Sequence, residues 1–331
     1  MFERNIYKDT SFSTYNQNRP KKPETMKKSK DRREPISNYE LRITNDKIRD
    51  SQSATRHQKA KVRNLNSEFQ KTNSPTTAHH SSVIFGVLPI LEALRAQNRR
   101  IEKIFVADGA HEKRLHEIFD LAKQNGVPFK KIPRTNLSKY VEENVNHQGI
   151  VAFVAAAEYA DAGKLFDEIT NKENSLSVIL DGVEDPRNLG AILRSVEGAK
   201  VDGVFLPERR AVGLTETVAK SSAGATEYVK VAKVTNINRL IDELKKNNIW
   251  VVGTSADAEI IYTDWDWTRA SALVLGGEGR GLHRLTAEKC DALVKIPLLG
   301  KIESLNVSVA CGVLLFEAVR QRSKVMINTE Q

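Results

Sequence analysis

The pattern of apolar and polar positions changes near residue 82. Residues 1–80 are rich in Lys, Arg, Asn, Ser and Thr and show no sustained hydrophobic period. Such a segment buries too little apolar surface to offset the entropy of ordering the chain, so we expect it to be disordered. From about residue 82 onward, short apolar runs alternate with amphipathic stretches, which predicts folded α/β structure.

The first run of alternating elements predicts a small α/β domain over residues 81–158. Strands are expected at 83–86, 101–107, 127–132 and 150–157, and helices at 87–97, 111–125 and 137–143. Residues 159–175 are expected to form a linker that carries one helix.

The second run predicts a larger domain over residues 176–326. Strands are expected at 177–180, 203–206, 228–231, 250–253, 272–275 and 292–296, and helices at 188–198, 216–222, 238–247 and 306–322. Short apolar strands that alternate with helices are typical of a mainly parallel sheet covered on both faces. Ligands of such sheets bind at the carboxyl ends of the strands, which is where the polar and glycine-rich segments of this domain fall.

The net charge of +9 lies entirely in the first part of the chain. Residues 1–80 hold 18 Lys and Arg against 9 Asp and Glu, whereas residues 81–331 hold 33 of each kind. A basic arm on a balanced body indicates contact with nucleic acid or an anionic surface, and a solubilising tail is the simpler alternative.

The cysteines, the histidines and the hydropathy of the chain argue against a disulfide-rich, metal-binding or membrane-spanning protein. Cys290 and Cys311 lie among apolar residues and are expected to pack as small hydrophobes. The seven histidines show no zinc-site spacing, so we expect no metal, and His147 is expected to cap a turn. No apolar run approaches the ~20 residues of a membrane span. Residues 1–10 lack a signal core, which predicts a cytoplasmic protein and leaves an organelle open.

A polar turn, residues 181–188, follows the predicted strand at 177–180. It leads into a helix with the pattern N-x-G-x-x-x-R, formed by Asn188, Gly190 and Arg194. If the helix begins near Asn188, Arg187 and Arg194 lie about two turns apart on one face and could grip a phosphate. Taken alone, the segment is explained more simply by a capped helix with a surface salt bridge.

A glycine-rich turn follows the predicted strand at 272–275. Residues 276–281 hold four glycines around Glu278 and Arg280, so the backbone can approach a ligand closely. No Gly-Lys-Ser/Thr follows, so the turn is not a P-loop, and the dinucleotide fingerprint is also missing. Glycines alone could make a tight turn, but Glu278 and Arg280 among them favour a binding site.

The third polar segment joins the last predicted strand to the last helix. Ile296 and Pro297 end the strand, Gly300 makes a turn, and small polar residues follow where the helix begins. We expect Ser304 to cap this helix. Small polar groups at this place suit an anion or a hydroxyl, although a capped helix on a sheet explains this segment by itself.

Together, in this order and spacing, the three segments resemble the motifs of the SpoU family of RNA ribose 2′-O-methyltransferases, in the SPOUT superfamily. They match N-x-G-x-x-x-R, L-x-x-G-x-E-G-x-G and I-P-x-x-G-x-x-x-S-L-N-V-S-V-A. The resemblance covers about residues 82–322. Residues 84–86 and 147–150 also resemble the substrate-binding domain of the ribosomal-RNA branch of the family.

The resemblance implies a fold and a cofactor. The fold is a C-terminal SPOUT domain with a parallel sheet and a deep trefoil knot, preceded by a small α/β, ribosomal-protein-like RNA-binding domain. The cofactor is S-adenosyl-L-methionine, which by position would contact Gly276, Ile296 and Leu305. The family also implies a homodimer in which one subunit completes the site of the other.

The resemblance further implies which residues carry the reaction. Arg194 is expected to stabilise a phosphate and the developing oxyanion, because a guanidinium with a pKa above about 12 is a poor base. The side chains expected to position Arg194, the ribose hydroxyl and the phosphate are Asn188, Glu278, Ser304 and Asn306.

We therefore expect a guanosine 2′-O-methyltransferase that acts on large-subunit ribosomal RNA. DNA lacks the 2′-hydroxyl and is not expected as a partner. A transfer-RNA methyltransferase is the alternative within the class, disfavoured by the small N-terminal domain. A non-catalytic RNA-binding or assembly factor is disfavoured by the intact polar motif residues, and a nucleotide-binding oxidoreductase by the missing fingerprint.

Overall fold

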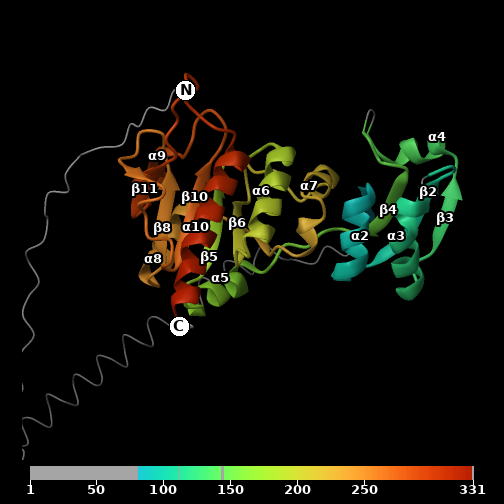
Figure 1. The fold of residues 1–331 in the computed structure, drawn as a ribbon, viewed down its shortest axis with the longest axis horizontal. Coiled ribbons are helices and arrows are strands. Elements are labelled where there is room, and N and C mark those ends of the chain that lie inside the picture. The colour runs from blue at the N-terminus through green and yellow to red at the C-terminus, as the bar shows by residue number, and fades with distance from the viewer. Residues whose placement is uncertain (1–80, 111, 143–144, 330–331) are drawn as a thin grey trace, which may run out of the picture. The chain divides into compact units, whose positions relative to one another are not determined.

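The computed structural model describes residues 81–110, 112–142 and 145–329, which form two sheets with their helices (Figure 1). The predictions for residues 1–80 lie outside the described residues. Within the described chain, no helix is long and apolar enough to cross a membrane.

The small domain is built on a four-stranded mixed sheet in the order β1-β4-β2-β3. β1 and β2 pair antiparallel with β4, and β3 pairs parallel with β2. Helices α2 and α3 bury one face of this sheet over Ile104 and Val106, and Leu137 packs on the other face. The elements are β1 Ser81–Phe85, α2 Val87–Ala96, β2 Ile101–Ala107, α3 Glu112–Gln124, β3 Phe129–Ile132, α4 Arg134–Leu137, the 3-10 turn η1 Ser138–Tyr140 and β4 Ile150–Ala155.

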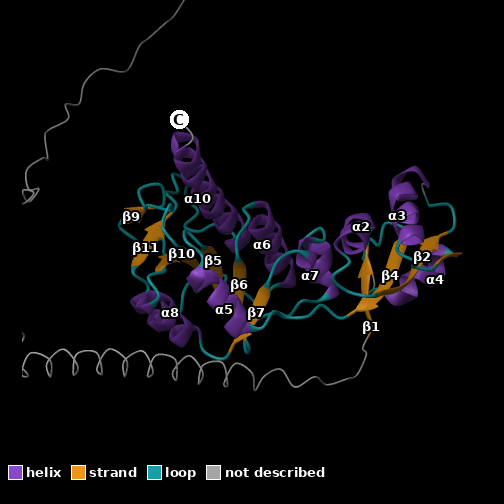
Figure 2. Cartoon of the chain, turned by 90° about the horizontal axis from the view of Figure 1, so that it is seen from below, coloured by secondary structure: helices purple, strands orange, loops and turns teal. Residues whose placement is uncertain are grey.

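The second domain is built on seven parallel strands in the order β7-β6-β5-β10-β8-β11-β9. Figure 2 shows α6 and α10 on one side of this sheet and α5 and α8 on the other. The elements are α5 Ala162–Asn171, β5 Leu176–Asp181, α6 Pro186–Gly198, β6 Gly203–Pro207, α7 Glu216–Ser221, the 3-10 turn η2 Ala225–Glu227, β7 Val231–Val234, α8 Ile237–Lys246, β8 Trp250–Thr254, β9 Ile260–Ile261, β10 Ser271–Gly276, α9 Arg284–Lys289, β11 Ala292–Lys295 and α10 Val307–Thr329.

The order of the strands reverses between β5 and β10. From β5 the chain adds β6 and β7 on one side, and β10 lies against the other side of β5. A parallel sheet binds ligands outside the carboxyl ends of the strands at such a reversal. The polar turn after β5 and the glycine-rich turn after β10 are both placed there.

Several predicted boundaries were wrong for local reasons. The expected strand at 228–231 begins at Val231, because residues 225–227 form the 3-10 turn η2. The expected helix at 137–143 begins at Arg134, directly after Pro133, and its 3-10 extension ends at Tyr140. The two-residue strand β9 and the helix α9 were not predicted. The helix of the expected linker, α5, buries Leu165 and Ile169 against the second sheet.

The last helix is capped by Asn306 rather than by Ser304. The Asn306 side-chain oxygen accepts the main-chain N–H of Ser308 at 2.9 Å and the Ser308 hydroxyl at 2.5 Å. Its main-chain oxygen accepts the N–H of Ala310 at 3.0 Å. The cap therefore lies two residues nearer to the helix than Ser304, which is where an N-cap oxygen can reach the orphan amides.

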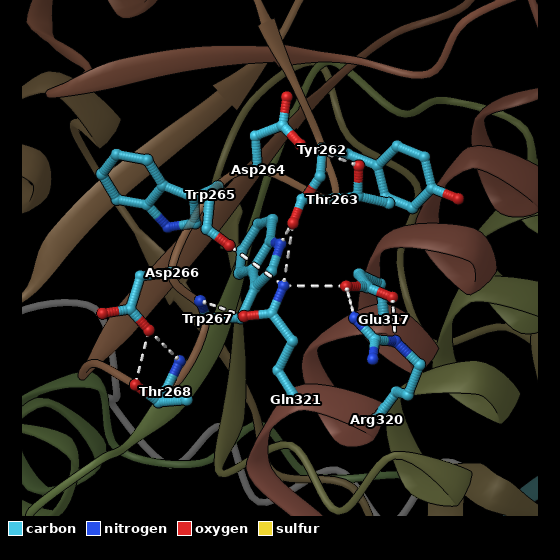
Figure 3. A network of polar contacts seen from close by, with 10 residues as sticks. All are labelled: Tyr262, Thr263, Asp264, Trp265, Asp266, Trp267, Thr268, Glu317, Arg320 and Gln321. Carbon is cyan, nitrogen blue, oxygen red and sulfur yellow. Dashed lines mark hydrogen bonds and ion pairs between the residues drawn. The ribbon is translucent and has the colours of Figure 1, made fainter. Parts of the chain in front are cut away.

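Gln321 fastens the C-terminal half of α10 to the loop after β9 (Figure 3). Its amide oxygen accepts the main-chain N–H of Trp267 at 3.0 Å, and its amide nitrogen donates to the carbonyl of Trp265 at 3.1 Å and to Glu317 at 2.8 Å. The indole of Trp267 is fully buried and donates to the carbonyl of Tyr262. This network fixes where α10 lies on the sheet and thus where its N-terminus meets the site.

Both cysteines are free thiols that pack among apolar residues, as predicted. Cys311 is fully buried in α10, and burial raises the pKa of its thiol to about 12. Burial also raises the pKa of Cys290 to about 12. Neither thiol is a nucleophile at neutral pH.

Candidate functional site

A cavity of about 630 Å³ opens at the carboxyl ends of β8, β10 and β11. Its size lies within the range of small-molecule and cofactor pockets, about 300–1,000 Å³. The three predicted cofactor contacts, Gly276, Ile296 and Leu305, all line it. Glu278, Ser304 and Asn306 line it as well, so two of the sequence motifs meet at one pocket.

Asn188, Glu278 and Asn306 form a closed triangle of hydrogen bonds at the rim of this pocket. The Asn306 amide nitrogen donates to Glu278 Oε1 at 2.9 Å and to the Asn188 side-chain oxygen at 3.0 Å. The Asn188 amide nitrogen donates to the same Glu278 oxygen at 2.5 Å. One residue of each motif takes part, which fixes the orientation of both amides and the carboxylate.

Local sequence explains why each member of the triangle lies there. Asp185 caps α6 by accepting the N–H of Arg187 at 2.6 Å, so Asn188 falls in the first turn and is buried. Glu278 projects from the turn that ends β10. Asn306 caps α10 with its oxygen and leaves its nitrogen to donate into the triangle.

The glycine-rich turn after β10 is too tight for side chains at its first two positions. A Cβ atom at Gly276 would lie 2.0 Å from the main chain of Gly281, and one at Gly277 would lie 2.3 Å from the carbonyl oxygen of Gly182. Both distances are well below any real Cβ contact. The backbone of this turn therefore forms the wall of the pocket, because side chains cannot intervene.

Asp181, the last residue of β5, holds both ends of this turn. Its main-chain oxygen accepts the N–H of Gly277 at 3.0 Å, and its carboxylate accepts the N–H of His283 at 3.0 Å. The His283 ring nitrogen Nδ1 lies 2.9 Å from the same carboxylate. The sequence signalled only an acidic turn here, since the role of Asp181 depends on β5 and β10 being neighbours in space.

Arg194 is not brought to the pocket of its own chain. It lies on the exposed side of α6, away from the cavity lining, and no hydrogen bond or ion pair of its guanidinium is found in the described part of the chain. Ser304 is exposed at the pocket, and its hydroxyl has no hydrogen-bond partner among residues 81–110, 112–142 and 145–329. Of the predicted site residues, Asn188, Glu278 and Asn306 are thus brought together, Ser304 lines the same pocket, and Arg194 lies outside the lining.

His147 caps a turn, as predicted. Its Nδ1 accepts the N–H of Gly149 at 3.1 Å, and its Nε2 lies 3.4 Å from the Ser138 hydroxyl. Burial lowers the pKa of this imidazole, and the nearby cation Arg134 lowers it further. His147 is therefore neutral at neutral pH and structural.

Sequence reasoning missed a third strand end at the pocket. Residues 254–257, at the carboxyl end of β8, also line the cavity. Their composition, Thr-Ser-Ala-Asp directly after an apolar strand, follows the same strand-end rule that indicated the other two segments. Among the described residues, no group of three or more His, Cys, Asp or Glu is arranged to hold a metal ion.

Comparison with known proteins agrees with this geometry. The sequence model of the SpoU rRNA Methylase family matches residues 175–316, and that of RNA 2′-O ribose methyltransferase substrate binding matches residues 83–160. A TrmH family tRNA/rRNA methyltransferase from Bacillus subtilis (strain 168), named YacO, is 42% identical over 243 residues, which are 73% of this chain and 96% of that protein. A homologue from Staphylococcus aureus (strain COL) is 42% identical over 245 residues, covering 74% of this chain and 98% of that one.

Solved structures show the same fold. The SpoU methyltransferase AviRb from Streptomyces viridochromogenes, in complex with the cofactor AdoMet, aligns with a TM-score of 0.60 at 25% identity and covers 78% of this chain and 98% of its own. The fold and the site define a parallel α/β methyltransferase. The chain belongs to the SpoU (TrmH) family of RNA methyltransferases, which confirms the resemblance seen in the sequence.

The cofactor of the enzyme is S-adenosyl-L-methionine, and the pocket residues fit it. A backbone wall at Gly276 and Gly277 leaves main-chain groups to meet a polar ligand, while Ile296 and Leu305 offer apolar contact. The lining of the pocket mixes apolar residues with polar and charged ones, as a cofactor with both polar and apolar parts requires.

Proposed function

We propose that this RNA methyltransferase modifies a ribose 2′-oxygen, that of a guanosine in large-subunit ribosomal RNA. The observation that carries the proposal is the Asn188–Glu278–Asn306 triangle at the rim of the cofactor pocket. It presents oriented amides and a carboxylate oxygen at the place where a hydroxyl would be positioned for transfer. The match of residues 83–160 to a 2′-O ribose substrate-binding domain supports ribose as the acceptor.

Methyl transfer requires the protein mainly to position the cofactor and the ribose hydroxyl. When bound, S-adenosylmethionine supplies a methyl group on a positively charged sulfur. The turn at Gly276, with Ile296 and Leu305, would hold the cofactor, and Glu278, held in place by Asn188 and Asn306, would orient the ribose hydroxyl. Correct placement of two reactants can contribute about 7–11 kcal/mol to lowering a barrier. Ser304 would contact the hydroxyl or the adjacent phosphate.

Arg194 would complete this site from a second subunit. Arg194 does not line the pocket of its own chain, which leaves room for a homodimer in which each subunit supplies the arginine of the other's site. α10 offers a surface for such contact, because Val309 and Phe316, seven residues apart on one face, are 51% and 50% exposed. Exposed apolar side chains in register on one helix are typical of an interface. The trefoil knot implied by the resemblance stays a prediction.

Ribosomal RNA is proposed over transfer RNA because the small domain resembles that of the ribosomal-RNA branch. The names of the relatives include both substrates. The deciding experiment maps 2′-O-methyl groups in ribosomal and transfer RNA from a strain that lacks this gene. Loss of one guanosine methyl group from large-subunit RNA is expected, and loss from transfer RNA alone would overturn the assignment.

A further inference from the structure

The sheet of the small domain carries rings and cations on the face turned away from α2 and α3. In the register of the sheet, Lys103 of β2 lies opposite Phe153 of β4, and Phe105 lies between Val151 and Lys130. Residues directly opposite in neighbouring strands share a face. Figure 2 shows α3 and α4 on opposite sides of this sheet, so the face is the one on which α4 and η1 lie.

Three rings and one ammonium group form a single cluster on this face. The Tyr140 ring, from η1, lies 5.2 Å from the Phe153 ring and 5.4 Å from the Phe105 ring, and the two Phe rings are 5.7 Å apart. The Lys103 ammonium lies 4.5 Å from the Phe153 centroid and 5.4 Å from that of Phe105. We name Lys103, Phe105, Tyr140 and Phe153 the ring–lysine surface.

The ring–lysine surface is open, and its surroundings are basic. Tyr140 is 40% exposed, Lys103 is exposed, and Phe105 and Phe153 are half-buried. Residues 129–141, which border the surface, contain four Lys and Arg and no Asp or Glu. Residues 81–331 as a whole are balanced in charge, so this stretch is a local excess of positive charge.

Rings beside cations suit an unpaired RNA base with its phosphates. Proteins that bind single-stranded RNA stack bases on aromatic rings and contact the backbone with Lys and Arg. A protein partner would meet an apolar surface interrupted by exposed cations, which is less favourable.

We propose that the ring–lysine surface is where the small domain stacks an unpaired base of the substrate RNA. Tyr140 supplies the stacking face, supported at its edge by Phe153, and Lys103 with Lys130 meets the flanking phosphates. The inference rests on the proposed function, because it deepens how that enzyme holds its RNA. It assigns the RNA-binding role of residues 83–160 to one face of the sheet.

Fluorescence anisotropy with the full chain and a labelled, unstructured single-stranded RNA oligonucleotide tests the proposal. Tyr140→Ala should weaken binding about tenfold or more, within the range that loss of one stacked base produces. Tyr140→Phe keeps the ring and should bind within about twofold of the wild type. The matched control is Phe129→Ala, since Phe129 is also exposed but stacks on Phe119 beside α3.

The salt dependence of RNA affinity distinguishes the contribution of the aromatic rings from that of the charged groups. Lys103→Met should lower the slope of log affinity against log salt by about 1, whereas Tyr140→Ala should leave that slope unchanged. If Tyr140→Ala binds RNA as well as Phe129→Ala does, or if Lys103→Met leaves the slope unchanged, the ring–lysine surface is packing only and the proposal fails.

The same samples distinguish this failure from failure of the proposed function. If the wild type binds the oligonucleotide through Tyr140 but no 2′-O-methyl product forms on ribosomal RNA, the reaction assignment is wrong and the binding surface stands. If the product forms but substitution of Tyr140 or Lys103 leaves RNA binding unchanged, the proposed reaction stands and the proposed binding surface is wrong.

Discussion

The amide nitrogen of Asn306 lies 3.0 Å from the side-chain oxygen of Asn188, although 118 residues separate them in the chain. Both also donate to one oxygen of Glu278. Asn306 also has a structural role, because its side-chain oxygen caps α10. A single side chain thus links the start of the last helix to the site, so changes at Asn306 should affect both stability and rate.

Asn306→Ala is predicted to slow methyl transfer at least about tenfold, because small losses of position cost rate steeply. It should also lower the free energy of unfolding by about 0.5–2 kcal/mol through loss of the cap. Asn236→Ala removes a comparable cap, the acceptor for the N–H of Arg239 at the start of α8, far along the chain from the motifs. Single-turnover kinetics and urea unfolding of both variants should show equal destabilisation but a rate defect in Asn306→Ala alone. Equal rates of methyl transfer in the two variants would show that the triangle has no part in the mechanism.

Gly276→Ala is predicted to weaken S-adenosylmethionine binding at least about tenfold, or ~1.4 kcal/mol. The added Cβ would lie 2.0 Å from the main chain of Gly281, so the turn must move. Gly198→Ala is the control, because a Cβ there meets only a ring carbon of Phe316, at the ordinary distance of 3.5 Å. Calorimetric titration of both variants checks this. Normal affinity in Gly276→Ala would mean that the turn is not the wall of the cofactor site.

Arg194→Ala is predicted to leave cofactor affinity nearly unchanged and to lower kcat about 10²–10³-fold, the typical effect of removing one preorganised donor. Arg194→Lys should restore little, because lysine lacks the planar fork. Arg284→Ala, which breaks an exposed ion pair with Glu288, is the control and should have normal kcat. A rate for Arg194→Ala within a few-fold of the wild type would return Arg194 to the role of a surface residue.

Mixing two impaired variants tests whether Arg194 acts across a dimer. In a heterodimer of Arg194→Ala with Asn306→Ala, one site would have both an intact triangle and an arginine from the other subunit. Activity is therefore predicted to rise above that of either variant alone on mixing and subunit exchange. If the activity of the mixture stays at the average of its components while light scattering shows heterodimers, Arg194 acts within its own chain or not at all.

His147 is predicted to make stability depend on pH. Burial lowers the pKa of the folded imidazole below its unfolded value of about 6.5. The unfolded chain then binds more protons, so the stability that neutral His147 contributes is present above about pH 6.5 and is lost as pH falls toward the folded pKa. Urea unfolding at a series of pH values should show a smaller loss in His147→Asn than in the wild type. Identical profiles for the wild type and His147→Asn would refute this role of His147.

Some strands and helices of the fold could be predicted from the sequence, and others could not. The apolar strands before Asp181 and Gly276 were visible because parallel strands buried on both faces are continuous apolar runs. The elements missed were β9, which has two residues, and α9, which has six. At such lengths periodicity is not detectable. The strand expected to begin at Tyr228 begins only at Val231, because the 3-10 turn η2 and its cap come directly before it.

The site was predicted less completely than the sheet. The motifs identified Asn188, Glu278 and Asn306, but only the strand order shows that their side chains bond one another. The same order explains why Asp181 was missed, since it acts on a turn about a hundred residues later in the chain. Ser304 was predicted as the helix cap, although Asn306 is an equally good cap by residue type. Only the geometry of the first turn decides between them.

The most direct test of the central claim is the chemical position of the transferred methyl group. The chain is incubated with S-adenosylmethionine labelled in its methyl group and unmodified large-subunit ribosomal RNA, and the RNA is then hydrolysed in alkali. Alkaline cleavage of RNA needs a free 2′-hydroxyl, so a 2′-O-methyl group protects the adjoining bond. Label is expected in alkali-resistant dinucleotides that begin with guanosine, and it should appear there at least about tenfold more slowly with the Asn306→Ala chain. Label in mononucleotides would place the methyl group on a base and contradict the account.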